Sequence, residues 1–188
     1  MGNGWVGRRL RNPRRQSPTA GSRQEAARVT MAGMPVPEFI RDLRRSIGHD
    51  LLWMPAVTAV VLDASSVLLV RRADNGRWAP VSGILEPGEQ PAICAAREVL
   101  EETRVAAQVQ RLVSVTACEP VTHANGDVAQ YLDLTFRCSY VSGDARVGDD
   151  ESLEVRWFPV DDLPVMTAQS RTRIEQALPA DGEVLFVR

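Results

Sequence analysis

The chain has 188 residues, of which 44% are hydrophobic and 24% are charged, and its formal net charge is −2 at pH 7. This composition is typical of one globular domain with a sizeable apolar core, and not of a fibrous or low-complexity chain. The apolar runs are much shorter than the roughly 20 residues that a membrane-spanning helix needs, so neither a transmembrane segment nor a membrane partner is expected.

Residue usage excludes several kinds of chemistry. All 22 basic residues are arginine, so lysine-dependent catalysis such as Schiff-base formation is ruled out, and any cationic contact with a substrate falls to arginine. The three cysteines, Cys94, Cys118 and Cys138, are widely spaced and form no CxxC pair, which argues against a disulfide framework and a zinc site. Reduced thiols in a cytoplasmic protein are the simpler interpretation.

The first 33 residues differ in composition from the rest of the chain. They hold seven arginines and one acidic residue, with many Gly, Pro and Ser residues and no sustained apolar periodicity, which predicts a disordered arm. An inert tail, or sequence preceding a start at Met31 or Met34, is favoured over a transit peptide or an anion-binding arm. Residues 34–188 hold 15 basic and 23 acidic residues, too acidic a balance to favour nucleic acid as a partner.

The predicted elements begin with a short amphipathic helix over residues 35–47 that stops at Gly48 and could pack on the domain or on a second subunit. The remaining elements are expected in this order: strands at 56–62 and 66–71, an extended segment at 78–84, a helix at 90–103, strands at 107–118, 128–140 and 155–159, a helix at 168–178, and a possible last strand at 183–187. Strands dominate the middle and helices flank them. We therefore expect one α/β domain over residues 34–188, with a mixed sheet between helices.

Three glutamates on the predicted helix at 90–103 carry the first chemical signal. At about 100° per residue, Glu98, Glu101 and Glu102 share one face of that helix. Like charges at this spacing repel one another, and a divalent cation would compensate for the repulsion. Carboxylate oxygens without nearby histidine or cysteine favour Mg2+, or Mn2+, over zinc. The apolar residues on roughly the opposite face are expected to pack on the core: Ile93, Ala96 and Leu100.

The loop before this helix has a consistent composition. Gly83 and Gly88 permit tight turns and the close approach of a backbone carbonyl to a metal ion. Glu89 and Arg97 have opposite charges and could pair across the junction of loop and helix. Such a pair would hold the loop on the helix.

Residues 83–105 resemble the Nudix box, GX5EX7REUXEEXGU, in which U is a bulky aliphatic residue. Eight defined positions match in register: Gly83, Glu89, Arg97, Glu98, Val99, Glu101, Glu102 and Val105. The departure is Arg104, which stands where the family pattern has glycine. A left-handed conformation costs a non-glycine residue roughly 1 kcal/mol or more, so a locally altered helix end is expected with the acidic face intact.

The resemblance implies the Nudix fold, an α/β/α sandwich in which the box forms loop, helix and loop. It also implies Mg2+-dependent hydrolysis of a nucleoside diphosphate linked to another group, by attack of water on phosphorus. Roles carried over from the family are metal binding by Glu98, Glu101, Glu102 and the Gly83 carbonyl, and orientation by Glu89 and Arg97. Glu151 stands six residues before Trp157, as a further metal-binding glutamate does in MutT-like members. The general base stays open between Glu98 and Glu151.

Candidate substrate contacts lie outside the box. Arg71 and Arg72 are close enough in sequence to meet phosphates, and Trp78 and Tyr131 are candidates for stacking on a base. His123 lies in a turn-rich segment, residues 119–127, that is expected to border the active site and to act as a specificity lid.

The substrate remains open at this stage. ADP-ribose or a related nucleotide derivative competes with a MutT-like activity on nucleoside triphosphates, because the box builds the hydrolytic site and the rest of the pocket selects the substrate. A nucleotide-sensing domain without catalysis is a third possibility, against which the intact acidic cluster argues. The resemblance also makes a homodimer possible.

Overall fold

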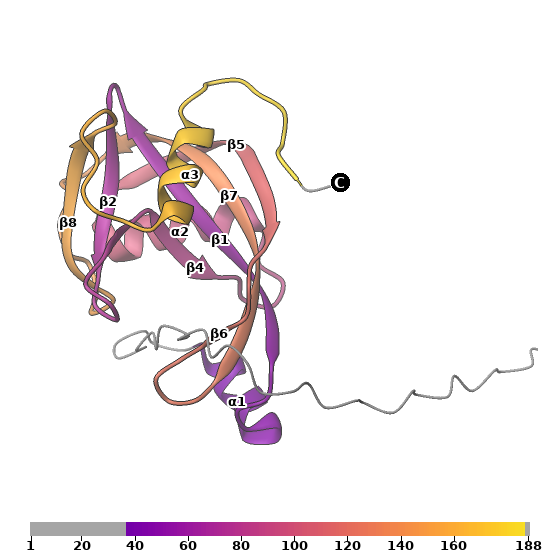
Figure 1. The fold of residues 1–188 in the computed structure, drawn as a ribbon. Helices are drawn as coiled ribbons and strands as arrows, with labels where there is room; N and C mark the ends of the chain where they lie inside the picture. The colour runs from indigo at the N-terminus through magenta and orange to yellow at the C-terminus, as the bar shows by residue number, and fades with distance from the viewer. Residues whose placement is uncertain (1–36, 187–188) are drawn as a thin grey trace, which may run out of the picture.

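A computed structural model describes residues 37–186, so the predicted arm at residues 1–33 lies outside the described part of the chain. Three helices are present, α1 (Glu38–Ile47), α2 (Pro91–Thr103) and α3 (Ala168–Ala177) (Figure 1). The strands are β1 (Leu52–Asp63), β2 (Ser66–Arg72), β3 (Trp78–Ala79), β4 (Val81–Ile84), β5 (Ala106–Ala117), β6 (Val121–Thr122), β7 (Val128–Ser142) and β8 (Ser152–Pro159). Apart from β6, each was expected from the sequence to within a few residues.

All eight strands belong to one mixed sheet, whose main order is β3-β2-β1-β7-β5. Strand β1 is central: it pairs with β7 in parallel, from Leu52 opposite Ala129 to Leu62 opposite Ser139, and antiparallel with β2 and β4. The other pairings are antiparallel, with β8 on β2 and β6 on β7. The sheet is therefore mixed, as the sequence predicted.

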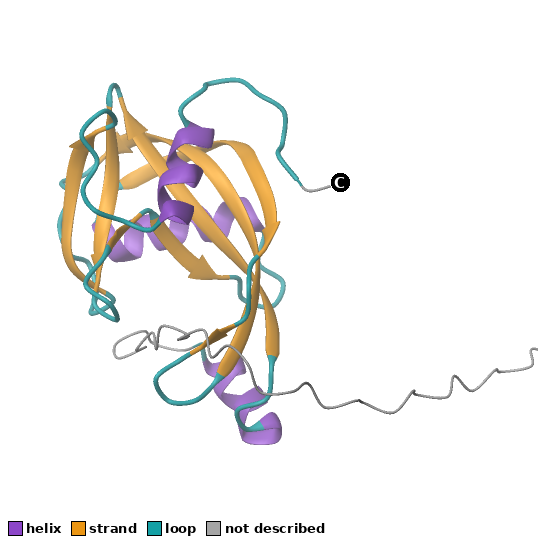
Figure 2. Ribbon diagram, viewed as in Figure 1, coloured by secondary structure: helices purple, strands orange, loops and turns teal. Residues whose placement is uncertain are grey.

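Helices α2 and α3 cover opposite faces of this sheet (Figure 2). Successive residues of β1 alternate between them: Val57 and Val61 join the core cluster under α2, whereas Val60 joins the cluster under α3. Each fully buried valine side chain contributes roughly 1.5 kcal/mol or more through the removal of apolar surface from water. The predicted α/β/α sandwich is confirmed. None of the helices within residues 37–186 is long and apolar enough to cross a membrane.

The buried face of α2 differs from the prediction. Its buried apolar side chains are Cys94, Ala95 and Val99, whereas Ile93 is 61% exposed and Leu100 is 50% exposed. The expected core face was wrong because the acidic face does not point directly away from the sheet. Part of it turns inward, which leaves the apolar residues opposite the acids facing solvent.

The C-terminus of α2 keeps the geometry of a glycine cap despite Arg104. This arginine adopts φ 60° and ψ 15°, the left-handed conformation, and its backbone N–H donates to the carbonyl of Leu100 at 3.0 Å. The expected alteration of the helix end is therefore absent. Arg104 itself takes the unfavourable conformation, at a cost of roughly 1 kcal/mol relative to glycine.

A projecting lobe is built where β1 and β7 run past the other strands, as Figure 1 shows, and it carries α1 and the β6–β7 hairpin. Ile40 of α1 packs there against Met54 and Ala129. The predicted helix at 35–47 is confirmed as α1 and ends at Gly48, whose φ is 59°. The possible strand at 183–187 was wrong for its described part, because residues 183–186 form only one isolated bridge, between Leu185 and β5.

Candidate active site

Three carboxylates, those of Glu98, Glu102 and Glu151, gather beside the C-terminal half of α2. Glu102 is only 4% exposed and accepts a hydrogen bond from the Ser152 hydroxyl at 3.1 Å. Burial, reinforced by the charges of Glu151 and Glu98, raises the pKa of Glu102 to about 8. Burial first, and neighbouring acids second, also raise the pKa values of Glu98 and Glu151 to about 7. The fold thus concentrates acidic groups where they hold protons strongly.

Gly83 makes room for one of these acids. A Cβ atom at this position would lie 2.0 Å from Cδ of Glu98, so any larger residue would displace that carboxylate. Gly83 is held in β4, opposite Val57 of β1, and its backbone cannot easily retreat. The first glycine of the box therefore allows Glu98 to lie directly against the strand backbone.

Arg97 connects the loop to the helix, as the sequence predicted. Its guanidinium donates to both carboxylate oxygens of Glu89, at 2.8 and 3.0 Å, and to Glu98 at 3.0 Å and Glu101 at 2.9 Å. The hydrogen bonds from Arg97 lower the pKa of Glu89 to about 2. Glu101 is 52% exposed at its side chain and is the least buried of the box glutamates.

The donor set fits a hard divalent cation. The side chains of Glu98, Glu102 and Glu151 offer only oxygen atoms as ligands. Their pKa values are raised, and a nearby positive charge would lower them again. The backbone of Gly83 lies against Glu98. Within residues 37–186, no three acidic, histidine or cysteine side chains already surround a single point. A metal ion held by these three carboxylates would therefore require them to turn toward a common point.

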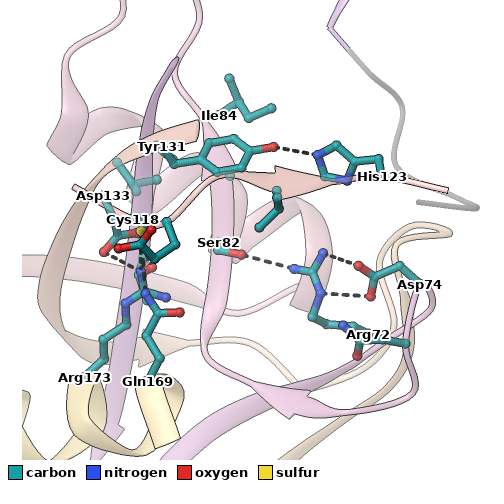
Figure 3. A pocket seen from close by; sticks show the side chains of 17 residues that line it. Arg72, Asp74, Ser82, Ile84, Cys118, His123, Tyr131, Asp133, Gln169 and Arg173 are labelled. Atoms are coloured by element: carbon teal, nitrogen blue, oxygen red, sulfur yellow. Dashed lines mark hydrogen bonds and ion pairs between the residues drawn. The ribbon is translucent and has the colours of Figure 1, made fainter. Parts of the chain in front are cut away.

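Two cavities adjoin at β4 and share Gly83 and Ile84. The smaller, of about 250 Å³, is lined by acids of the box region together with Arg97, Glu151 and Pro37 of the projecting lobe. The larger, of about 490 Å³, is lined by polar side chains from several elements, which Figure 3 shows: Arg72, Asp74, Ser82, His123, Tyr131, Asp133, Gln169 and Arg173. Its size is that of a small-molecule site.

Arg72 lines the larger cavity. It donates to both oxygens of Asp74, at 3.0 and 2.9 Å, and to the Ser82 hydroxyl at 3.3 Å (Figure 3). Burial acts to lower the pKa of Arg72, but the hydrogen bond and charge of Asp74, together with the charges of Glu102 and Glu151, outweigh burial and raise it. One arginine of the larger cavity is thus within electrostatic reach of the acidic cluster.

His123 and Tyr131, both predicted substrate contacts, lie together on one wall of the larger cavity. The His123 Nε2 atom lies 3.2 Å from the Tyr131 hydroxyl, while Nδ1 is buried without a hydrogen-bond partner in the described part of the chain. Burial lowers the pKa of His123, which favours the neutral form of the ring. Within the predicted lid at 119–127, Glu119, Val121 and His123 line this cavity.

The larger cavity also holds a pair that the sequence analysis missed. Asp133, 4% exposed in the middle of β7, accepts hydrogen bonds from Thr58 at 2.6 Å and Thr135 at 2.8 Å, and Arg173 of α3 lies 3.0 Å away. A lone acid within an apolar strand run was the available signal. Its partner could not be read from sequence, because Arg173 follows it by 40 positions (173 minus 133) and lies on a different element.

Two other predicted substrate contacts lie elsewhere. Arg71 points to Glu154 on β8, at 3.7 Å, and Trp78 packs edge-on against Phe158 with ring centroids 4.8 Å apart. Neither residue lines either of the two cavities. The structure therefore brings Arg72, His123 and Tyr131 together and leaves Arg71 and Trp78 outside.

The chain is similar in sequence to several known proteins. The family model "NUDIX domain" matches residues 52–179. The NAD-capped RNA hydrolase NudC of Pseudomonas syringae pv. tomato is 33% identical over 116 residues, 61% of this chain but 39% of the relative, so the chain spans about two fifths of that protein. A MutT-like protein of Streptomyces ambofaciens is 36% identical over 110 residues, 58% of this chain and 66% of the relative.

Solved structures agree with the family match. A NUDIX hydrolase from Nitrosomonas europaea superposes with a TM-score of 0.54 at 26% identity, covering 65% of this chain and 68% of that one. A UDP-X diphosphatase shares the fold, with a TM-score of 0.59 at 22% identity over 79% of this chain and 74% of that one. The chain belongs to the Nudix family, whose members are hydrolases that act on pyrophosphate bonds.

Proposed function

We propose that this chain is a divalent-metal-dependent pyrophosphohydrolase acting on a nucleoside diphosphate linked to another group, with ADP-ribose and related nucleotide derivatives as the substrate class. The observation that carries the proposal is the junction at Gly83, where the cavity lined by Glu98 and Glu151 adjoins a cavity of about 490 Å³. The diphosphate would lie at the junction, with the nucleoside in the larger cavity. NudC and UDP-X diphosphatase, named for different substrates, support the reaction class only.

The acidic residues receive these roles in the proposal. Glu98, Glu102 and Glu151, with the Gly83 carbonyl, would hold Mg2+ or Mn2+, and Glu101 would bind at the exposed rim. When bound, the ion supplies positive charge that stabilises the diphosphate oxygens and activates water. Glu98 or Glu151 would accept the proton of the attacking water, because both carboxylates face the smaller cavity. Arg97 and Glu89 would keep loop and helix in register.

The charges of the larger cavity favour an uncharged moiety there. Its lining includes three acids, Asp74, Glu119 and Asp133, against Arg72 and Arg173, and each arginine is already paired with one of these acids. A second phosphate would meet no excess of positive charge, whereas a nucleobase and ribose would find hydrogen-bonding groups. Arg72, whose pKa is raised by the charges of Glu102 and Glu151, would meet the diphosphate.

A MutT-like activity on nucleoside triphosphates is the second candidate, supported by the 36% identity to the MutT-like relative. In that case the terminal phosphates would extend through the smaller cavity, and the leaving group would be pyrophosphate. A cytoplasmic location is proposed with either activity, because all three cysteines are free thiols. A homodimer stays a prediction.

One experiment tests both candidates. The chain would be incubated with Mg2+ or Mn2+ and a panel of ADP-ribose, nucleotide sugars, dinucleoside polyphosphates and nucleoside triphosphates, and phosphate-containing products would be quantified. Glu102→Gln should lower kcat by about 100-fold or more, because it removes a proposed metal-binding oxygen without changing the shape of the side chain. Glu101→Gln is the matched control, and its kcat should fall less because that side chain is half exposed.

The outcomes separate the candidates. Products from diphosphate derivatives alone would establish the first activity, and pyrophosphate from triphosphates the second. Binding of nucleotides without hydrolysis of any compound would contradict both and identify a nucleotide-sensing domain.

A further inference from the structure

The loop that carries Glu151, residues 143–151, lies across the C-terminal end of α2. The last carbonyls of a helix lack partners within it. Here the loop supplies donors to two of these carbonyls. The backbone N–H of Arg146 donates to the carbonyl of Thr103 at 3.0 Å, and the backbone N–H of Gly148 donates to the carbonyl of Glu102 at 2.9 Å. The end of the acidic helix and the loop bearing the fourth glutamate are therefore one hydrogen-bonded unit.

The contact between them is unusually close. A Cβ atom on Gly143 would lie 2.4 Å from the carbonyl oxygen of Arg104, and one on Gly148 would lie 1.9 Å from that of Glu101. Both neighbours are backbone atoms, which cannot swing aside as a side chain could. Two glycines thus allow the loop to touch the helix end at two separate points.

Arg104 takes part in anchoring the loop at both glycines. Its own carbonyl lies under Gly143, and its guanidinium donates a hydrogen bond to the carbonyl of Gly148. The peptide groups of Gly148 are consequently held on both sides, by Glu102 through the N–H and by Arg104 through the carbonyl. A glycine at position 104 could adopt the same left-handed backbone but could not make the side-chain contact.

The anchored peptide lies just before Glu151. The backbone N–H of Glu151 donates to the Asp149 carboxylate at 3.0 Å, and its carbonyl accepts from Ala73 at 2.8 Å, so the stretch after Gly148 is fixed at its far end as well. We propose that Arg104 is a positioning residue: its guanidinium, bonded to the loop at Gly148, sets the place of the Glu151 carboxylate relative to Glu98 and Glu102. The inference rests on the proposed metal-binding role of Glu151.

Opposite effects on stability and on metal binding give the inference a sharp test. Arg104→Gly relieves the left-handed strain but removes the guanidinium, so the metal-free variant should melt at or above the temperature of the wild-type chain. Its dissociation constant for Mn2+, measured by electron paramagnetic resonance or calorimetry, should rise about three- to tenfold, as expected for one lost hydrogen bond. Arg104→Lys keeps a donor and should bind Mn2+ within about twofold of wild type.

Two further variants separate positioning from the loss of a charge. Arg146→Ala removes an equal charge from the loop at 143–151 itself, and in the described part of the chain only the backbone of Arg146 makes a hydrogen bond. Loss of positive charge near acids should by itself tighten Mn2+ binding, so weaker binding in Arg104→Gly cannot be a charge effect. Glu151→Gln measures the full contribution of the positioned carboxylate.

Each pattern of Mn2+ affinities has one meaning. Weaker Mn2+ binding by Arg104→Gly, with rescue by Arg104→Lys and none of this loss in Arg146→Ala, supports the positioning role. Wild-type affinity in Arg104→Gly, or equal losses in Arg104→Gly and Arg104→Lys, overturns it while leaving the proposed hydrolase intact. Wild-type affinity in Glu151→Gln overturns it at its premise and removes Glu151 from the proposed metal site.

Discussion

The two cavities that meet at Gly83 are built in different ways. The smaller is lined mainly by the box region, residues 83–101, with Glu151 and Pro37 added from outside. The larger is assembled from β1, β2, β4, β7, the segment at 118–123 and α3, which lie far apart in the chain. Most of the groups proposed to break the bond thus come from one segment of the chain, whereas the groups proposed to select the substrate depend on the whole fold. Variants of the smaller cavity should therefore lower kcat for every substrate, whereas variants of the larger cavity should raise KM in a substrate-dependent way.

The largest effect should come from Gly83→Ala, on the acidic side. Its Cβ atom would lie 2.0 Å from Cδ of Glu98, so the carboxylate must shift by an ångström or more. A displacement of that size can lower kcat about 100-fold, and the loss should be the same for every substrate. In a Glu98→Gln background, Gly83→Ala should add almost nothing, and a full additional loss would contradict the contact as its cause.

A smaller, substrate-dependent effect is expected from Arg173→Gln, on the other side. Removing the partner of buried Asp133 should raise KM about tenfold for the preferred nucleotide and change kcat little. Arg171→Gln is the matched control, because this exposed arginine on the same helix lines neither cavity. An equal loss of kcat on all substrates would show that the larger cavity does not act in selection.

The acidic side should also respond to pH. The folded-state pKa values of Glu98, Glu102 and Glu151, about 7 to 8, lie above the ordinary value of 4.5, so the metal-free fold prefers these groups protonated. The stability they contribute is complete below pH 4.5 and is lost as pH rises through about 7 to 8. Melting temperature in chelator should fall between pH 4.5 and pH 8, while Mn2+ affinity rises. Flat profiles would show that the pKa values of these three acids are not raised in the folded chain.

The smallest effect concerns the loop–helix pair. Glu89→Gln should lower the free energy of unfolding by about 1–2 kcal/mol, because its side chain is only 13% exposed and bonded to Arg97. Asp42→Asn, in the exposed pair with Arg45, should cost less than about 0.5 kcal/mol.

With a folded pKa near 2, Glu89 contributes stability above pH 4.5 that is lost as pH falls toward 2. Denaturant titrations at pH 7 and pH 3 measure both differences.

What sequence could predict follows the same division. Local patterns predicted the Glu89–Arg97 pair and the order of helices and strands along the chain, and the structure confirms both. The buried face of α2 does not follow from apolarity alone, because Glu102 turns inward and bonds to Ser152, fifty residues away. Asp133 and Arg173 share no spacing rule, so only the folded sheet reveals them as neighbours. Arg104 was recognised as unusual, but its contact with Gly148 was not foreseeable.

Cys118 is a site where a fluorescent label could be attached to this protein. Cys94 and Cys138 are fully buried, and burial raises both pKa values to about 12, so neither thiol reacts readily. Cys118 is half-buried, lines the larger cavity and accepts weak hydrogen bonds from Gln169 and Arg173. A single maleimide dye would therefore attach at the wall of that cavity without any substitution. The natural chain already contains the attachment point for a fluorescent reporter of ligand occupancy.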